Sequence, residues 1–136
     1  MKNIIFMSIK EQHIERVLNK TKNNEFRTRI PNKKVDYIFV YIPMPVKELK
    51  YILKVKKPIR TPNKIKIEGI GNDTFNKETE EKYAYPIEIV YKINRTLNLE
   101  ELKERFNFTA PQSFAYGERY FDIVKYIEET GITKLF

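Results

Sequence analysis

Several residue types are scarce or absent in this chain, and each absence excludes a kind of chemistry. Cysteine is absent, which excludes disulfides, thiolate nucleophiles and cysteine-based zinc or iron–sulfur sites. The single histidine, His13, excludes a histidine-rich metal site, and we read it as plain surface. No apolar run approaches the roughly 20 residues of a membrane span, and the run after Lys2 is too short for a secretory signal. We therefore expect no cofactor, no metal and no membrane partner, and a cytoplasmic location.

Acidic residues are also in deficit. The 136 residues carry 26 Lys and Arg against 18 Asp and Glu, a formal net charge of +8. Residues 20–34 contain six basic side chains against one acidic, and residues 47–66 contain eight against one. Clustered cations favour phosphate-bearing partners, because nucleic acids release condensed counterions when they bind. A soluble basic protein without such a partner is the alternative, and the oligomeric state is left open.

The length suits one domain, residues 1–136, with one core. Hydrophobic patterns predict strands over residues 3–9, 35–42, 49–56 and 86–93, the last being the final clear strand. Residues 35–42 are apolar on nearly both faces, as in a central strand. Residues 49–56 place Tyr51, Leu53 and Val55 on a core side and lysines on the other, and only Ile52 breaks the pattern. In residues 86–93, Ile87, Ile89, Tyr91 and Ile93 face inward, opposite Glu88, Val90 and Lys92.

Helical spacing predicts helices over residues 10–19, after Asn98, and over about 119–129. Asn98 with Glu101 forms a possible capping box, and Gly131 is a stop signal for the last helix. Residues 57–82 contain several Pro and Gly breakers and then acidic residues, which predicts a long connection that is either a functional loop or disordered. Strands of one period with helices early, late and at the end predict an α+β class: a small barrel or curved sheet with flanking helices.

The motif with the clearest chemical content is Lys22-x-x-Glu25-x-Arg27, followed by Arg29. If residues 24–30 are extended, Glu25, Arg27 and Arg29 share one face, so that one carboxylate lies among cations. The guanidinium groups would grip a phosphate through paired hydrogen bonds, and Glu25 would accept hydrogen bonds from a base or a ribose hydroxyl. The alternative is structural: lysines at a helix C-terminus and a Glu25–Arg27 ion pair.

These motifs together resemble the ASCH domain, a branch of the PUA-like barrel superfamily. The resemblance begins with Ser8-Ile9-Lys10, the helix ending at Asn19, and the Lys22 motif; Lys20 stands where the family usually has glycine. It continues with residues 83–89, with residues 99–102, and with Ala110-Pro111-Gln112-Ser113-Phe114, and it covers about residues 5–126. The resemblance implies a small PUA-like β-barrel of mixed strands with flanking helices. It also implies a basic cleft that binds RNA or a nucleotide, beside a hairpin that carries the Lys22-x-x-Glu25-x-Arg27 motif.

The candidate site residues follow from the motif and the resemblance together. The set expected to contact nucleic acid is Ser8, Lys10, Lys22, Glu25, Arg27, Arg29, Gln112 and Ser113. For the last two, the alternative is that Gln112 satisfies backbone groups while Phe114 fills the barrel. Tyr41 and Tyr51 are offered as stacking platforms for bases only secondarily, because their positions favour the core.

Two functional classes stay open. One is an RNA- or nucleotide-binding module. The other, implied by ASCH relatives, is a small hydrolase of the N4-acylcytidine amidohydrolase or ribonuclease type, with Lys22 as base or nucleophile and Glu25 as proton carrier. Glu25 stands where the amidohydrolase branch carries threonine, so that branch's mechanism does not transfer directly.

Overall fold

The computed structural model describes all residues, 1–136, as eight strands and five helical segments. The strands are β1 (Ile4–Ser8), β2 (Asn24–Arg27), β3 (Tyr37–Ile42), β4 (Glu48–Val55), β5 (Ile59–Arg60), β6 (Tyr83–Asn98), β7 (Ala115–Tyr116) and β8 (Ile132–Lys134). The helices are α1 (Glu11–Leu18), α2 (Asn72–Asn76), α3 (Leu99–Phe106), α4 (Phe121–Thr130) and a 3₁₀ turn, η1 (Gly117–Tyr120). None of the helices is both long and apolar enough to cross a membrane.

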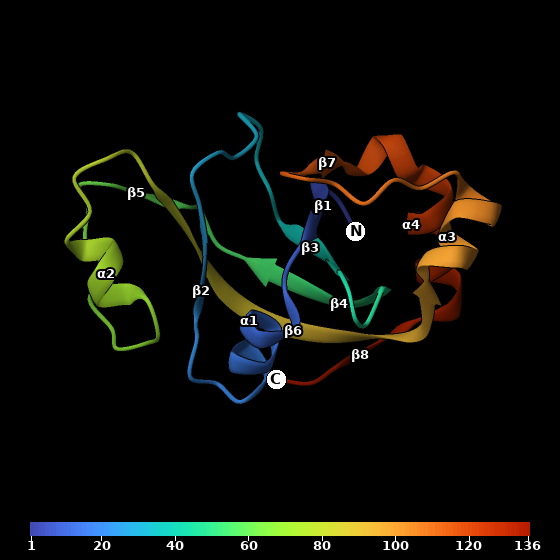
Figure 1. Cartoon of the computed structure of the whole chain (residues 1–136), viewed down its shortest axis with the longest axis horizontal. Helices are drawn as coiled ribbons and strands as arrows, with labels where there is room; N and C mark the ends of the chain where they lie inside the picture. Colours follow the sequence, from blue (N-terminus) through green and yellow to red (C-terminus); the bar gives the residue numbers. More distant parts are fainter.

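The strands form one mixed sheet that curls into a half-barrel (Figure 1). Its main order is β2-β6-β4-β3-β1-β7, with β5 and β8 also paired to β6. Only the β1–β3 pair is parallel, which fits the helical crossover that α1 provides between them. The long strand β6 reaches from β2 and β5 to β4 and β8, and therefore joins both halves of the molecule. The α+β half-barrel confirms the predicted fold class.

Two hydrophobic clusters cover the two faces of the sheet. Along β3, Ile38, Val40 and Ile42 belong to the cluster beneath α1, whereas Phe39 and Tyr41 belong to the cluster beneath α3 and α4. All five are almost fully buried, as the two-sided apolar pattern predicted for a central strand. Tyr41 is therefore a core residue, and its burial raises the pKa of its hydroxyl.

The predicted faces of β4 and β6 are right only in part. In β4, Tyr51, Leu53 and Val55 lie on one hydrophobic cluster as predicted, while Ile52, the exception in the pattern, is fully buried in the other cluster. Register shifts between Leu49 and Tyr51 and between Lys54 and Val55 change which residues face each side. In β6, Val90 is completely buried although the pattern placed it outward. Residues 86–93 are not the last strand, since β7 and β8 follow.

The connection over residues 57–82 is folded against the rest of the chain. It contains β5 and α2, and Ile65 and Phe75 form a third small cluster with Ala84 of β6. Phe26 of β2 packs on Phe75 with ring centroids 5.8 Å apart. The disordered alternative for this segment is therefore wrong, and it forms the left-hand lobe in Figure 1.

The helix boundaries agree with the sequence signals. The Asn98 side chain accepts a hydrogen bond of 2.9 Å from the Glu101 backbone N–H, which caps α3 as predicted. Helix α4 ends at Gly131, whose φ of 91° lies in the region that only glycine adopts readily. Predicted inward residues of this last segment, Tyr120, Ile123, Val124 and Ile127, are buried.

Candidate nucleic-acid interface

A tight turn after α1 directs the Lys22 motif inward. Lys20 adopts a left-handed conformation, with φ of 67°, at the position where ASCH relatives usually have glycine. The backbone N–H groups of Thr21 and Lys22 both donate to the Arg16 carbonyl at 3.0 Å, and Asn19 accepts from Thr21. These bonds hold the non-glycine residue in a conformation that costs it about 1–2 kcal/mol. The chain then enters β2 with Lys22 facing the interior.

The side chains of Lys22, Glu25 and Arg27 meet in one charged cluster, which we call the triad. The Arg27 guanidinium lies 3.3 Å from Glu25 Oε1, and the Lys22 ammonium lies 3.9 Å from Glu25 Oε2. Lys22 and Glu25 expose only 7% and 6% of their side chains, and Arg27 exposes 18%. The Lys22 ammonium also lies over the Phe26 ring, 5.5 Å from its centroid. The predicted ion pair between Glu25 and Arg27 is therefore present. Unlike a surface ion pair, it is largely removed from solvent.

Hydrogen-bonding capacity remains unused within the triad. Glu25 Oε2 and Arg27 Nε are buried and have no hydrogen-bond partner, and neither does the neighbouring Asn24 Oδ1. Burial raises the pKa of the Glu25 carboxyl despite the opposing effect of Lys22 and Arg27. Burial likewise lowers the pKa of Lys22, helped by Arg27 and Arg16 and opposed by Glu25. Such groups are costly to leave unpartnered, and they are common at binding sites.

Arg27 links β2 to a strand at the far side of the sheet order. One guanidinium nitrogen donates to the Ser8 backbone carbonyl at 2.9 Å, and the Ser8 hydroxyl donates to the Pro111 carbonyl at 2.7 Å. Since β2 begins the sheet order and β1 lies near its other end, this chain of bonds spans the open side of the half-barrel. It brings together three regions predicted from sequence: the Ser8 segment, the Lys22 motif and the turn after Pro111.

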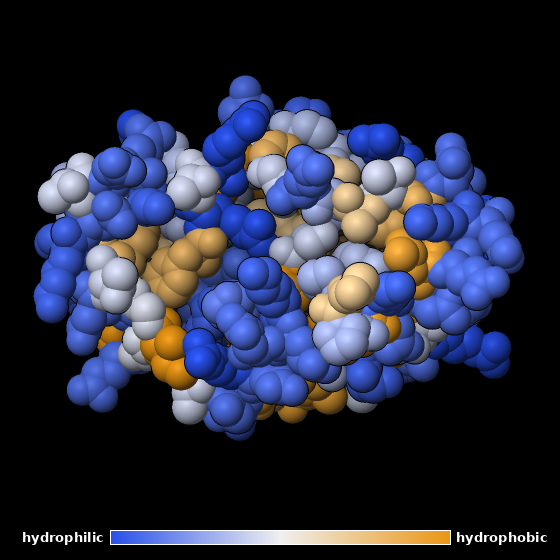
Figure 2. Space-filling model, in the orientation of Figure 1, coloured by the Kyte–Doolittle hydropathy of each residue, from blue (hydrophilic) through white to orange (hydrophobic).

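The other predicted residues lie around the triad's elements without bonds to it. Lys10, Arg29 and Gln112 are exposed, and Ser113 is half-buried. Strand β2 ends at Arg27, two residues before Arg29. Glu25 and Arg27 therefore share a strand face as predicted, but Arg29 lies beyond the strand. Gln112 makes no hydrogen bond to the backbone, so the alternative role suggested for it is wrong. Figure 2 shows that hydrophilic residues dominate this face of the molecule, over α1 and its surroundings.

Sequence reasoning missed His13. This residue is half-buried on α1, and burial together with the charges of Lys22, Arg16, Lys10 and Arg27 lowers its pKa. The reading of His13 as plain surface is therefore wrong. A signal existed in the sequence: His13 lies three residues before Arg16 on α1 and three after Lys10, the residue that precedes the helix.

An asparagine cluster, also missed by the sequence analysis, fixes the 57–82 connection to residues 21–24 at the start of β2. Asn72 donates to Asn23 Oδ1 at 2.9 Å, Asn23 donates to the Glu68 carbonyl at 2.8 Å, and Asn24 also bonds to Asn23. The backbone of Ile70 donates to the Thr21 carbonyl. Nothing in the spacing of these residues predicts the contact, because it joins positions almost 50 residues apart.

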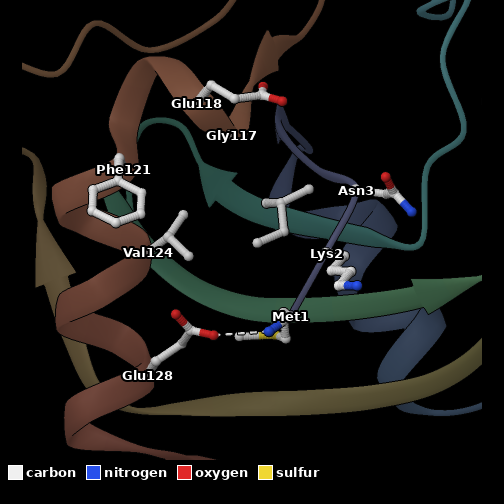
Figure 3. A pocket seen from close by; sticks show the side chains of 9 residues that line it. Met1, Lys2, Asn3, Gly117, Glu118, Phe121, Val124 and Glu128 are labelled. Atoms are coloured by element: carbon white, nitrogen blue, oxygen red, sulfur yellow. Dashed lines mark hydrogen bonds and ion pairs between the residues drawn. The ribbon is translucent and has the colours of Figure 1, made fainter.

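A separate cavity of about 330 Å³ lies between the N-terminal residues and α4 (Figure 3). Met1, Phe121 and Val124 contribute apolar surface, and the Met1 amine pairs with Glu128 at 2.8 Å. None of the ligand-contacting residues predicted from the sequence lines this cavity.

Comparison with solved structures identifies the ASCH protein of Zymomonas mobilis as similar. Its crystal structure matches with a TM-score of 0.63 and 22% sequence identity, over 92% of this chain and 96% of that chain. Two variants of the same protein, one with a serine changed to alanine and one with a tyrosine changed to phenylalanine, match with 21% identity and the same TM-score. No protein-family model and no curated protein sequence matches this chain. The likeness shows an ASCH-domain fold, as the sequence resemblance implied.

Proposed function

We propose that this chain, which folds as an ASCH domain, is a module that binds single-stranded RNA or a nucleotide at the triad. One observation carries the proposal: a buried carboxylate and guanidinium, with a lysine beside them, retain unpartnered hydrogen-bonding atoms. A protein does not usually leave buried polar atoms unpaired without a function for them. A ligand with a donor for Glu25 and an acceptor for Arg27 or Lys22 would complete the group.

The hydrogen-bonding groups of a nucleotide match the unpartnered atoms of the triad. The amino group of a base or a ribose hydroxyl donates to a carboxylate, so either would pair with Glu25 Oε2. Base carbonyls and ring nitrogens accept from Lys22 or Arg27. The exposed Lys10 and Arg29 would contact phosphates, which position a strand without selecting its sequence. The surplus of eight positive charges supports the same class of partner.

The test is a salt titration of RNA binding. A fluorescently labelled single-stranded oligonucleotide is expected to bind at low salt and to weaken steeply as salt rises. Lys22→Ala should reduce affinity by tenfold or more. Lys125→Ala, which removes the same charge from an exposed position on α4, should change it less than twofold. Affinity that does not respond to salt, or equal effects of the two substitutions, would count against the proposal.

A second candidate, a small hydrolase, is favoured by the opposite pKa shifts within the triad. A lowered Lys22 pKa increases its fraction of neutral amine, and a raised Glu25 pKa increases its fraction of protonated acid. In amide hydrolysis, neutral Lys22 would accept a proton from the attacking water while protonated Glu25 donates one to the leaving amine. Lys22 and Glu25 would then supply both the general base and the general acid of the reaction.

Incubation with N4-acetylcytidine and with labelled RNA separates the two candidates. Product that appears with the natural chain and disappears with Lys22→Ala identifies a hydrolase. Retention of the ligand without product identifies a binding module. Circular dichroism of the variant should show the same fold as the natural chain, so that loss of activity is not loss of structure.

A further inference from the structure

A second cavity, of about 340 Å³, opens beyond the end of β2. Its walls include Ile30, Pro31, Pro58 and Tyr85, and the charged part of its lining comes from Lys33, Lys34 and Lys57 against one carboxylate, Asp36. The volume lies at the lower end of the range of small-ligand pockets, roughly 300–1,000 Å³. An apolar interior with cations at its edge suits a flat, weakly polar group that carries a nearby negative charge.

Tyr85 gives this cavity a polar atom in a buried wall. The side chain is only 1% exposed, but its hydroxyl oxygen is not among the buried atoms that lack a hydrogen-bond partner, so what remains accessible lies at the cavity. Burial raises its pKa to about 12, so the hydroxyl keeps its proton at neutral pH and can donate it. A tyrosine hydroxyl at the wall of an otherwise apolar cavity offers one fixed donor to a ligand inside it.

The cavity adjoins the triad. Tyr85 of β6 stands directly opposite Glu25 of β2 in the antiparallel register, and residues paired in this way project from the same face of the sheet. Ile30 and Pro31 follow Arg27 by three and four residues. The two binding surfaces are therefore separated by about one side chain.

We infer that this cavity is a second nucleotide subsite, which takes the base next to the one held at the triad. The base would pack between Pro31 and Pro58 with one polar edge on the Tyr85 hydroxyl. Lys57 and Lys34 would contact the phosphate groups of the same strand. Lys57 has no ion pair, whereas Lys34 is 76% exposed and pairs with Asp36, which also lines the cavity, at 3.7 Å, so a bound phosphate would replace this carboxylate as the partner of Lys34. The inference rests on the proposed function, and it adds that the ligand is a strand of at least two nucleotides.

The experiment compares ligands of different length by calorimetry. The probes are cytidine monophosphate, the dinucleotide CpC, and two CpC analogues in which one or the other ribose lacks its base. We expect CpC to bind at least fivefold tighter than the mononucleotide, and one abasic analogue to lose that gain. The double variant Lys34→Gln/Lys57→Gln and the single variant Tyr85→Phe should each reduce the gain, whereas Lys22→Ala should weaken both ligands.

The matched control is Lys125→Gln/Lys134→Gln, which removes two charges from exposed positions on α4 and β8. Equal affinity for CpC and the mononucleotide, or an equal loss in the control and in Lys34→Gln/Lys57→Gln, overturns the second subsite but leaves the triad's role standing. No binding of any probe by the natural chain overturns both. A gain confined to CpC, dependent on Lys34, Lys57 and Tyr85, supports the inference.

Discussion

Replacing the two most buried charges of the triad should make the fold more stable and abolish ligand binding. The double variant Lys22→Met/Glu25→Leu removes one positive and one negative charge, so the formal net charge stays at +8. Any loss of RNA affinity is then independent of the overall charge. The same substitution removes Glu25 Oε2, which is buried without a hydrogen-bond partner. The two readings differ in the combined result, because only a ligand site predicts that RNA affinity falls while stability rises.

The size of the effect follows from the burial of the two side chains. Replacing a buried ion pair with apolar residues of similar volume stabilises proteins by about 1–4 kcal/mol in favourable cases. Arg27 loses its 3.3 Å contact with Glu25 but keeps its bond to the Ser8 carbonyl, so we expect the lower half of that range. A gain of about 1–2 kcal/mol corresponds to a Tm increase of roughly 3–10 °C for a chain of this length.

Thermal and urea unfolding of four proteins, the natural chain, both single variants and the double variant, form the assay. Glu25→Leu alone leaves Lys22 buried without its carboxylate and should cost about 3 kcal/mol, which the second substitution recovers. RNA affinity of the double variant should fall at least tenfold. If instead the double variant is less stable than the natural chain and still binds RNA, the triad is a structural element and the reasoning fails.

Two further predictions use single residues near the triad. The sole histidine gives one resolved set of ring signals in NMR. Burial and the nearby cations should hold the pKa of His13 below its ordinary value in the free protein, and a bound phosphate that offsets Lys22 and Lys10 should raise it. An unchanged pKa with saturating nucleotide would place the phosphate elsewhere. Asn72→Ala removes the donor to Asn23, which should cost about 1–3 kcal/mol and speed amide exchange in residues 66–76; the same exchange rates in variant and natural chain would show that this bond does not hold the segment.

Much of the fold could be predicted because local patterns and tertiary structure agree. Strand β3 reads as a central strand because both of its faces meet apolar clusters, and the α3 boundary follows from the capping side chain of Asn98. The second face of β4 could not be assigned from alternation alone, since Ile52 is buried only because a second apolar cluster covers that face. Strands β7 and β8, of two and three residues, are too short to leave a periodic signal.

The site divides in the same way. The convergence of Glu25 and Arg27 follows from alternation along four residues of β2, which is a local property. The bond from Arg27 to the Ser8 carbonyl depends on how far the sheet curls, and no spacing in the sequence encodes that curl. The asparagine cluster and the position of Tyr85 opposite Glu25 likewise arise only when distant segments pair.

The edge position of β2 has a consequence for how this fold acquires ligands. Its four residues form a ladder with β6 alone, so a different segment can replace residues 20–29 without breaking any strand pair other than β2–β6. Transplanting that segment between proteins of the same architecture should carry ligand preference with it. Differences in ligand preference would then arise at this edge strand, while the hydrophobic core stays the same.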